Sequence, residues 1–248
     1  NYIKSYKGKV DIISSTGITP LILALKNKND DIVDELLSKG ADPMLMEDPM
    51  QYSAYHFAAL HGQLSALNKF FVKKPPDFNV LDYKQRSIIT CCVAKGQLDA
   101  LNSILTRKPS IDASVIQIME SLIRLDENKA IHISEALFKE GFPLNIPMES
   151  GKTLLRETFD QQKFTFLKSI LNYIKKIINN PDTNDARKAK NNEAMVSSLL
   201  ELEQPCFINA VVNEMSVDII QAFLDAGMTP KIYSLGRPLI HETAGHSR

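Results

Sequence analysis

The sequence predicts an all-α fold in which short helix pairs stack as repeats. Three observations support this prediction: a motif that recurs at a nearly constant spacing, apolar residues that recur at helical spacing inside each copy, and an apolar content that is mostly aliphatic. Apolar residues make up 44% of the 248 residues, aromatic residues make up 7%, and tryptophan does not occur. This composition suits stacked amphipathic helices better than an aromatic-cored β-sandwich.

Each copy of the motif opens with a residue that comes directly before a short apolar helix. Seven positions share this place, and they are separated by 34, 34, 33, 33, 53 and 32 residues. We therefore expect six repeats and a truncated seventh in a single domain that covers residues 1–248. The opening residues are Thr19, Ser53, Ser87, Glu120, Thr153, Cys206 and Pro238.

The first repeat carries the clearest helix signals. Thr19 is a suitable N-cap, and Pro20 occupies the first helical position, where no backbone donor is lost. Gly40 is placed to adopt the left-handed conformation that ends the second helix. Two helices of about ten residues cannot bury an apolar face alone, so neighbouring repeats must stack.

The later repeats keep the same apolar pattern with differing clarity. Residues 87–94 and 207–212 have high intrinsic strand propensity, yet we expect stacking to make both segments helical. The fourth repeat keeps only an apolar frame of Leu122, Leu125, Leu137, Phe138 and Gly141. In the clear repeats the apolar face of the second helix consists of Ile32, Val33, Leu36 and Leu37; Ala66, Leu67, Phe70 and Phe71; Ala100, Leu101, Ile104 and Leu105; and Ile219, Ile220, Phe223 and Leu224.

The spacing of 53 residues between Thr153 and Cys206 predicts an insertion at about 172–204, between the fifth and sixth repeats. Apolar residues from Phe164 to Ile178 predict that a long helix leads into it. Residues 180–192 have no apolar residue beyond alanine, and we expect them to form a mobile surface loop before a helix resumes. The basic cluster in this insertion lacks interleaved aromatic residues, so we interpret it as a solvated linker and not as an anion site.

The segments ITPLILAL and SKGADP of the first repeat resemble the ankyrin repeat. Tyr55-His56-Phe57-Ala58-Ala59 with Gly62, and the final fragment from Pro238 to Ala244, are similar to the first-helix signature of that family. The resemblance implies an ankyrin-type helical repeat solenoid that binds a partner protein on the concave surface of its turn tips and first helices. The tetratricopeptide array has a similar period, but its longer helices leave little room for the connection SKGADPMLMEDPM.

Several segments match catalytic or ligand-binding motifs only in part, and we expect no catalytic residues, no metal and no cofactor. Ser150-Gly151-Lys152-Thr153 resembles the end of a phosphate-binding loop, but Ile146 stands where that loop needs a glycine. His241 and His246 are five residues apart, whereas two histidines that bind one zinc ion from a protease helix are four apart. On a helix these two side chains would therefore point in different directions. The cysteines occupy positions of first helices where other repeats have small apolar residues, so we expect their thiols in the core; they are Cys91, Cys92 and Cys206. An enzyme with a thiol nucleophile is a third alternative for the function.

Charge and cysteine content narrow the partners and the compartment. The 29 basic and 29 acidic residues leave no net field for a polyanion, so nucleic acid is not an expected partner. No apolar run approaches the roughly 18 residues of a membrane span. An odd number of cysteines indicates a reducing compartment, which is the cytoplasm, or the host cytosol if the chain is a secreted bacterial effector. The chain starts at Asn1 and stops inside a repeat, so we expect it to be a fragment of a longer protein.

The expected function is protein–protein interaction, and the alternative is a substrate-selecting, non-catalytic arm of a larger enzyme. His56 and His241 share one repeat position, where we expect a structural hydrogen bond to the backbone of the neighbouring repeat. Met44, Met46 and Met50 form either a pliable binding surface or a loop that covers the first repeat, and both interpretations stay open. The candidate partner-binding residues lie just before the first helices or at their ends; they are Met50, Tyr52, Leu60, His61, Tyr83, Lys84, Arg86 and Lys95.

Overall fold

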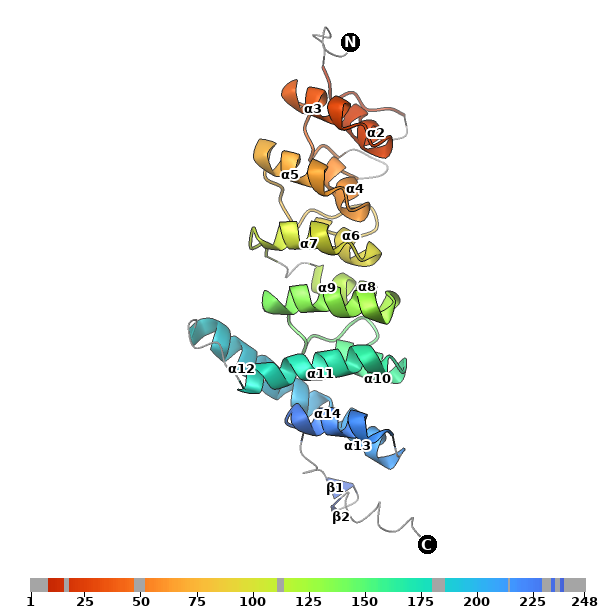
Figure 1. The fold of residues 1–248 in the computed structure, drawn as a ribbon, viewed down its shortest axis with the longest axis vertical. Helices are drawn as coiled ribbons and strands as arrows, with labels where there is room; N and C mark the ends of the chain where they lie inside the picture. Colours follow the sequence, from red (N-terminus) through yellow and green to blue (C-terminus); the bar gives the residue numbers. More distant parts are fainter. Residues whose placement is uncertain are drawn as a thin grey trace. The chain divides into compact units, whose positions relative to one another are not determined.

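A computed structural model of the chain describes residues 9–15, 18–46, 52–110, 114–179, 186–213, 215–228, 233–234 and 237–238. Helices dominate these residues (Figure 1), and the strands within them are two residues long. Two compact units are present: one comprises residues up to 125 together with 132–140, and the other comprises 126–131 together with 141 onward. That all of residues 1–248 form one repeat domain stays a prediction.

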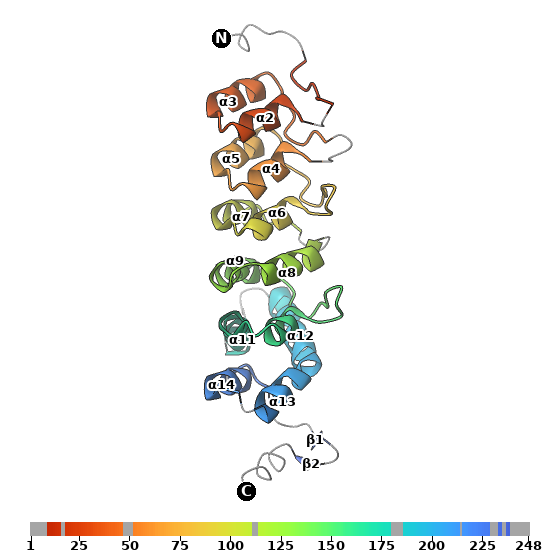
Figure 2. The same cartoon turned by 90° about the vertical axis from the view of Figure 1, so that its right-hand side faces the viewer.

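The first unit contains helix pairs in which the first and the second helices lie on opposite sides (Figure 2). The first helices of these pairs pack against one another in chain order, and so do the second helices of the first three pairs. The first helices are α2 (Pro20–Lys26), α4 (Ala54–Leu60), α6 (Ile88–Lys95) and α8 (Val115–Arg124). The second helices are α3 (Asp30–Ser38), α5 (Leu64–Lys73), α7 (Leu98–Leu105) and α9 (Glu127–Lys139), of which α9 has its first residues in the second unit.

Hydroxyl side chains begin the first three helix pairs as the repeat predicts. Thr19 Oγ1 accepts a hydrogen bond from Ile22 N at 3.2 Å, and Ser53 and Ser87 cap α4 and α6 in the same way. These contacts satisfy backbone donors that the first turn of a helix leaves without partners. The helical prediction for residues 87–94 is confirmed, because α6 is a helix whose apolar residues are buried on both sides by α4 and α8.

The fourth helix pair corrects one predicted position. We expected a helix to begin near Glu120, but α8 begins at Val115, five residues earlier. The apolar stripe of Val115, Ile118, Met119 and Leu122 fixes this helix, because burying it against α6 requires all four residues on one face. A constant spacing therefore misplaced the start of a repeat whose preceding connection is shorter than the others.

The second unit contains α10 (Leu154–Asp160), α11 (Phe164–Asn179), α12 (Ala186–Leu202), α13 (Gln204–Val212) and α14 (Val217–Asp225). The helical predictions at Thr153 and for residues 207–212 are confirmed. Near Pro238 we expected a helix, but Arg237–Pro238 (β2) pairs antiparallel with Tyr233–Ser234 (β1). Residues 239–248, which include His241 and His246, lie outside the described part of the chain.

Helix α12 follows the long helix α11 within the predicted insertion. Residues 180–185 lie outside the described residues, but residues 186–192 form the first turns of α12, so the prediction of a loop through Asn192 is wrong there. Alanine, lysine and arginine have high helix propensity, and the following Met195, Val196 and Leu199 are buried. Met195 Sδ accepts a hydrogen bond from Leu144 N at 3.3 Å, so this helix packs on the loop that precedes α10.

Two glycines end second helices at equivalent turns. Gly40 has φ 88° and Gly141 has φ 82°, which places both in the left-handed region that favours glycine. A Cβ atom at either position would meet no atom within 4 Å, so the requirement for glycine comes from the backbone angle alone. The prediction that Gly40 is a left-handed cap is confirmed.

Candidate functional site

Helix α4 presents a row of rings on its accessible side. Because α4 starts directly after Ser53, Phe57 and His61 are one helical turn apart and share a face, and their ring centroids are 4.3 Å apart. The ring of Tyr52, just before the helix, lies 6.2 Å from that of Phe57 in an edge-on arrangement. Tyr52 and Phe57 are half-buried and His61 is exposed.

His56 anchors the helix that carries this row. Its side chain is fully buried, its Nδ1 lies 2.7 Å from Ser53 Oγ, and its Nε2 lies 3.2 Å from the carbonyl oxygen of Val80. Burial lowers the pKa of His56, so the neutral ring is favoured. This histidine makes the expected hydrogen bond to the backbone, but its partner Val80 lies in the connection before the neighbouring repeat and not in that repeat itself.

The loop before α6 places a second group of candidate residues. Asp82 is fully buried, and its Oδ2 accepts hydrogen bonds from Arg86 Nε at 2.9 Å and Arg86 Nη2 at 2.6 Å. The other carboxylate oxygen accepts from the backbone of Lys84 and Arg86. This fixed turn leaves Tyr83 44% exposed, with Lys84 Nζ 5.3 Å from its ring centroid. Arg86 therefore shapes the loop, whereas Tyr83 and Lys84 face outward.

The turns at the ends of the first helices bring basic side chains together. Partial desolvation of its ring lowers the pKa of His61, and the neighbouring charges of Lys95 and Lys28 lower it further. The turns are tied between repeats, because Gln63 Nε2 donates to the carbonyl of Leu25 at 2.8 Å and Gln97 Nε2 donates to that of Leu60 at 3.4 Å. Lys28, His61 and Lys95 thus occupy fixed turns of three successive repeats.

Most of the candidate binding residues lie on the first helices of the first unit or in the segments next to them. Leu60 is half-buried, Lys95 is exposed, and Met50 lies outside the described residues. The sequence reasoning missed Phe57 and its counterpart Leu23, which is 49% exposed. The sequence could have indicated both residues, because each comes directly after the buried first-helix position that His56 occupies in the second repeat. We call Leu23, Tyr52, Phe57, Leu60, His61 and Tyr83 together the first-helix surface.

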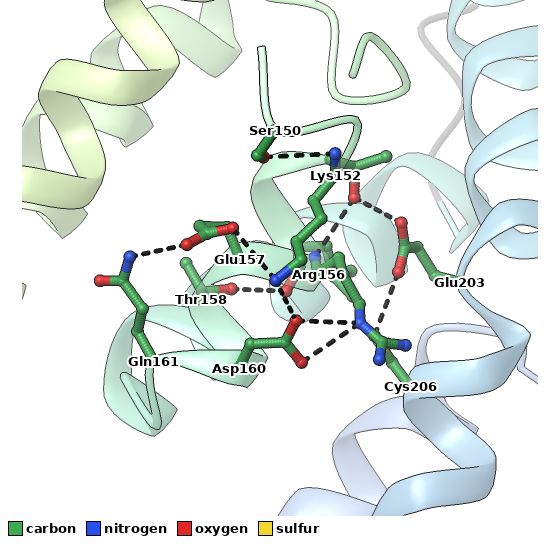
Figure 3. Close-up of polar contacts among 11 residues, drawn as sticks. Ser150, Lys152, Arg156, Glu157, Thr158, Asp160, Gln161, Glu203 and Cys206 are labelled. Carbon is green, nitrogen blue, oxygen red and sulfur yellow. Dashed lines mark hydrogen bonds and ion pairs between the residues drawn. The ribbon is translucent and has the colours of Figure 1, made fainter. Parts of the chain in front are cut away.

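The corresponding part of the second unit is a network of paired charges. Figure 3 shows Lys152 and Arg156 both directed at Asp160, at nitrogen–oxygen distances of 2.9 and 3.2 Å. The buried Glu203 accepts hydrogen bonds from Thr153 Oγ1 and, at 3.1 Å, from Cys206 Sγ. A cavity of about 380 Å³ beside this network is lined by Lys152, Arg156, Glu203 and neighbouring residues.

The cysteines and the possible ligand groups offer no further site. All three thiols are fully buried, as the sequence predicts, and burial raises the pKa of Cys91 to about 12 and raises those of Cys92 and Cys206. Within the described ranges, no group of three or more His, Cys, Asp or Glu residues could hold a metal ion. No helix among the same residues is long and apolar enough to cross a membrane.

Comparisons with known proteins agree with this repeat geometry. Residues 21–115 match the family model described as ankyrin repeats in three copies. The chain is 30% identical to the B-cell lymphoma 3 protein homolog of Mus musculus over 151 residues, which are 59% of this chain and 34% of that protein. The chain therefore spans about one third of the length of this curated relative.

Solved structures show the same fold. The ankyrin repeat protein EF0377 superimposes with a TM-score of 0.63 at 21% identity, covering 69% of this chain and 89% of that one. An ankyrin repeat domain from Acinetobacter baumannii gives 0.62 at 20% identity, with the same two coverages. The ankyrin repeat domain of Bcl-3 gives 0.57 at 20% identity, covering 66% and 74%. With the capped, stacked helix pairs, these findings show that residues 21–115 consist of ankyrin repeats and that the chain has the ankyrin-repeat fold.

Proposed function

We propose that the chain binds a partner protein through the first-helix surface of its first unit. Ankyrin repeats are protein-interaction modules, so the coarser function follows from the family. The location is supported by one observation: apolar and aromatic side chains of α2, α4 and the loop before α6 stay accessible on a side where the rest of each helix is buried. Contiguous accessible aromatic groups are typical of binding surfaces, where they supply much of the binding energy.

The scaffold beneath this surface is rigid, which favours binding. His56 joins α4 to the loop at Val80, and the Asp82–Arg86 pair fixes the turn that carries Tyr83. Side chains held in place before binding lose less conformational entropy on association. Helix α4 and the hydrogen-bonded loop before α6 therefore hold the side chains of the first-helix surface in one arrangement.

The same surface serves the alternative function, in which the repeats select substrates for a larger enzyme. Both functions need a bound partner protein, and the chain supplies the recognition in each. The cytoplasmic location stays a prediction, as does the host cytosol for a secreted effector.

A matched pair of exposed apolar residues tests the proposed surface. Leu23→Glu places a charge on the first-helix surface, whereas Val72→Glu does so on α5, where Val72 is 85% exposed. Proteins captured from a lysate by the chain and by the Val72→Glu variant, but lost from the Leu23→Glu variant, are the expected result. Melting temperatures of both variants check that the fold is kept. Capture that is equal for both variants would locate binding outside the first-helix surface.

A further inference from the structure

The last helix pair of the described residues keeps part of its apolar surface accessible. Ile208 and Val211 lie about one helical turn apart on α13, and both are half-buried. We call these two residues the terminal face. In the first, second, third and fifth repeats the equivalent residues are at most 4% exposed; they are Leu21, Tyr55, Ile89 and Leu155 at the first position, and Ala24, Ala58, Cys92 and Thr158 at the second.

The helix pair that follows accounts for this difference. In the first unit, α4, α6 and α8 each pack against the first helix before them, and in the second unit α14 packs against α11. Among the described residues no helix follows α14. The terminal face therefore corresponds to a surface that the next helix pair covers in the earlier repeats.

The turn after α14 is built like the turn after α3, which leads into the second repeat. Gly227 has φ 84° and Gly40 has φ 88°. In both turns the next N–H donates to the carbonyl five residues earlier, at 3.1 Å for Met228 and at 3.0 Å for Ala41. Helix α14 therefore ends in the kind of turn that, after α3, carries the chain to a further repeat.

The sequence that follows this turn supplies apolar residues at the matching distance. Residues 226–238 lead from α14 to Leu239, which is nearly the length of the connection from α5 to α6. In register with the second repeat, Leu239 and Ile240 correspond to Ala54 and Tyr55, which are both buried. Two aliphatic residues therefore stand where a following repeat has buried side chains, and burying them against other apolar groups is favourable.

We propose that residues 239–248, which lie outside the described residues, pack on the terminal face, with Leu239 and Ile240 against Ile208 and Val211. A segment tethered to α14 through so short a connection acts at a high effective concentration, so it occupies the face in preference to a separate protein or a second copy. This inference does not depend on the first-helix surface, because it concerns other residues of the chain.

Hydrogen exchange followed by mass spectrometry tests this contact in the full chain and in a chain that ends at Pro238. Removing residues 239–248 should lower the exchange protection of α13 about tenfold and leave that of α10 within about twofold of the full chain. Leu239→Gln combined with Ile240→Gln makes the same test without a deletion, and it should lower the protection of α13 by a similar factor.

A matched pair of variants shows whether Ile208 is covered by this segment. Ile208→Gln should lower the protection of α13 about fivefold more in the full chain than in the shortened chain, because only the full chain has the segment that contacts it. Val217→Gln is the control, since Val217 is 79% exposed on α14. Its effect should be the same in both chains within about twofold.

Equal protection of α13 with and without residues 239–248 would overturn the proposal, as would an effect of Ile208→Gln that is the same in both chains. Light scattering identifies the competing occupant. A mass of two chains that Ile208→Gln reduces to one, and that removal of residues 239–248 leaves unchanged, would assign the terminal face to a second copy. None of these outcomes bears on the first-helix surface, which Leu23→Glu tests separately.

Discussion

Helices α4 and α10 occupy the same place in their repeats, yet their accessible sides differ in chemistry. Both begin after a hydroxyl cap, since Ser53 accepts from His56 N and Thr153 accepts from Arg156 N. Both also send the fourth residue of the motif toward the following repeat: His56 to Val80 O, and Arg156 Nη1 to Cys206 Sγ at 3.5 Å. The remaining equivalent positions hold Phe57 and Glu157, Leu60 and Asp160, and His61 and Gln161.

The comparison separates the residues that make a repeat from those that give it a function. The hydroxyl cap is kept, and the fourth position keeps a polar side chain that contacts the following segment, although His56 is buried and Arg156 is half-buried. The other accessible positions are free of these roles. In α4 they are aromatic and apolar, whereas in α10 two of them are the carboxylates Glu157 and Asp160, which pair with Lys152 and Arg156. The first unit therefore has accessible aromatic and apolar side chains at these positions, whereas the second has charges that pair with one another.

The largest expected effect comes from removing the buried anchor. His56→Ala leaves a cavity and removes a hydrogen-bond partner of the Val80 carbonyl, so we expect the free energy of unfolding to fall by about 2–4 kcal/mol. Arg156 is half-buried, and Arg156→Ala should cost about 1 kcal/mol. Denaturant unfolding of both variants measures the difference. Equal losses would mean that the two anchors are equivalent despite their different burial.

Substitutions of the turn glycines, in contrast, should lower the stability of both units equally. Gly40→Val forces a β-branched residue to positive φ, and we expect a loss of about 1–3 kcal/mol that is confined mainly to the first two repeats. Gly141→Val should cost the second unit a similar amount, because neither position has atoms near the added Cβ. Hydrogen exchange by mass spectrometry assigns each loss to its unit. An unchanged melting curve for Gly40→Val would show that the left-handed turn is not required.

The two tyrosines of the first-helix surface should separate stability from binding. If both tyrosines only face a partner, as their sequence positions predict, Tyr52→Ala and Tyr83→Ala leave stability within about 0.5 kcal/mol. Tyr52 is half-buried against His56 and Phe57, so we now expect Tyr52→Ala to cost about 1 kcal/mol, whereas the exposed Tyr83 keeps the earlier expectation. Each variant should weaken partner binding by about 1–2 kcal/mol, measured by calorimetry. Unchanged binding in both would place the site on other repeats.

The smallest effect is a difference in pH dependence between the units. Burial lowers the pKa of His56, so below its unfolded value of about 6.5 the unfolded chain binds more protons and the first unit loses stability. Burial alone would raise the pKa of Asp160, but hydrogen bonds from Lys152 and Arg156 lower it, so this stability is lost only below about pH 4. Exchange protection in α4 should therefore fall before that in α10 between pH 7 and 5. His56→Gln should abolish the difference.

The sequence by itself determined the repeat, its caps and its core. The sequence shows a period of about 33 residues, hydroxyl residues before apolar runs, and Gly40 at a turn. Helix caps and turns satisfy local requirements of the backbone, so the residues that meet them can be recognised in the sequence; the caps are Thr19, Ser53, Ser87 and Thr153. The buried cysteines were also predictable, because small apolar residues at helical spacing face the neighbouring helix.

Only the tertiary structure decided the start of α8, the course of α12 and the composition of the first-helix surface. The start of α8 depends on burying its apolar stripe against α6, which spacing alone does not specify. Phe57 and Leu23 joined the surface because their exposure is set by neighbouring helices, whereas Arg86 left the outward-facing group because Asp82 is buried beside it. Local signals fix where a helix begins and ends, but the exposure of a side chain depends on residues that are distant in the sequence.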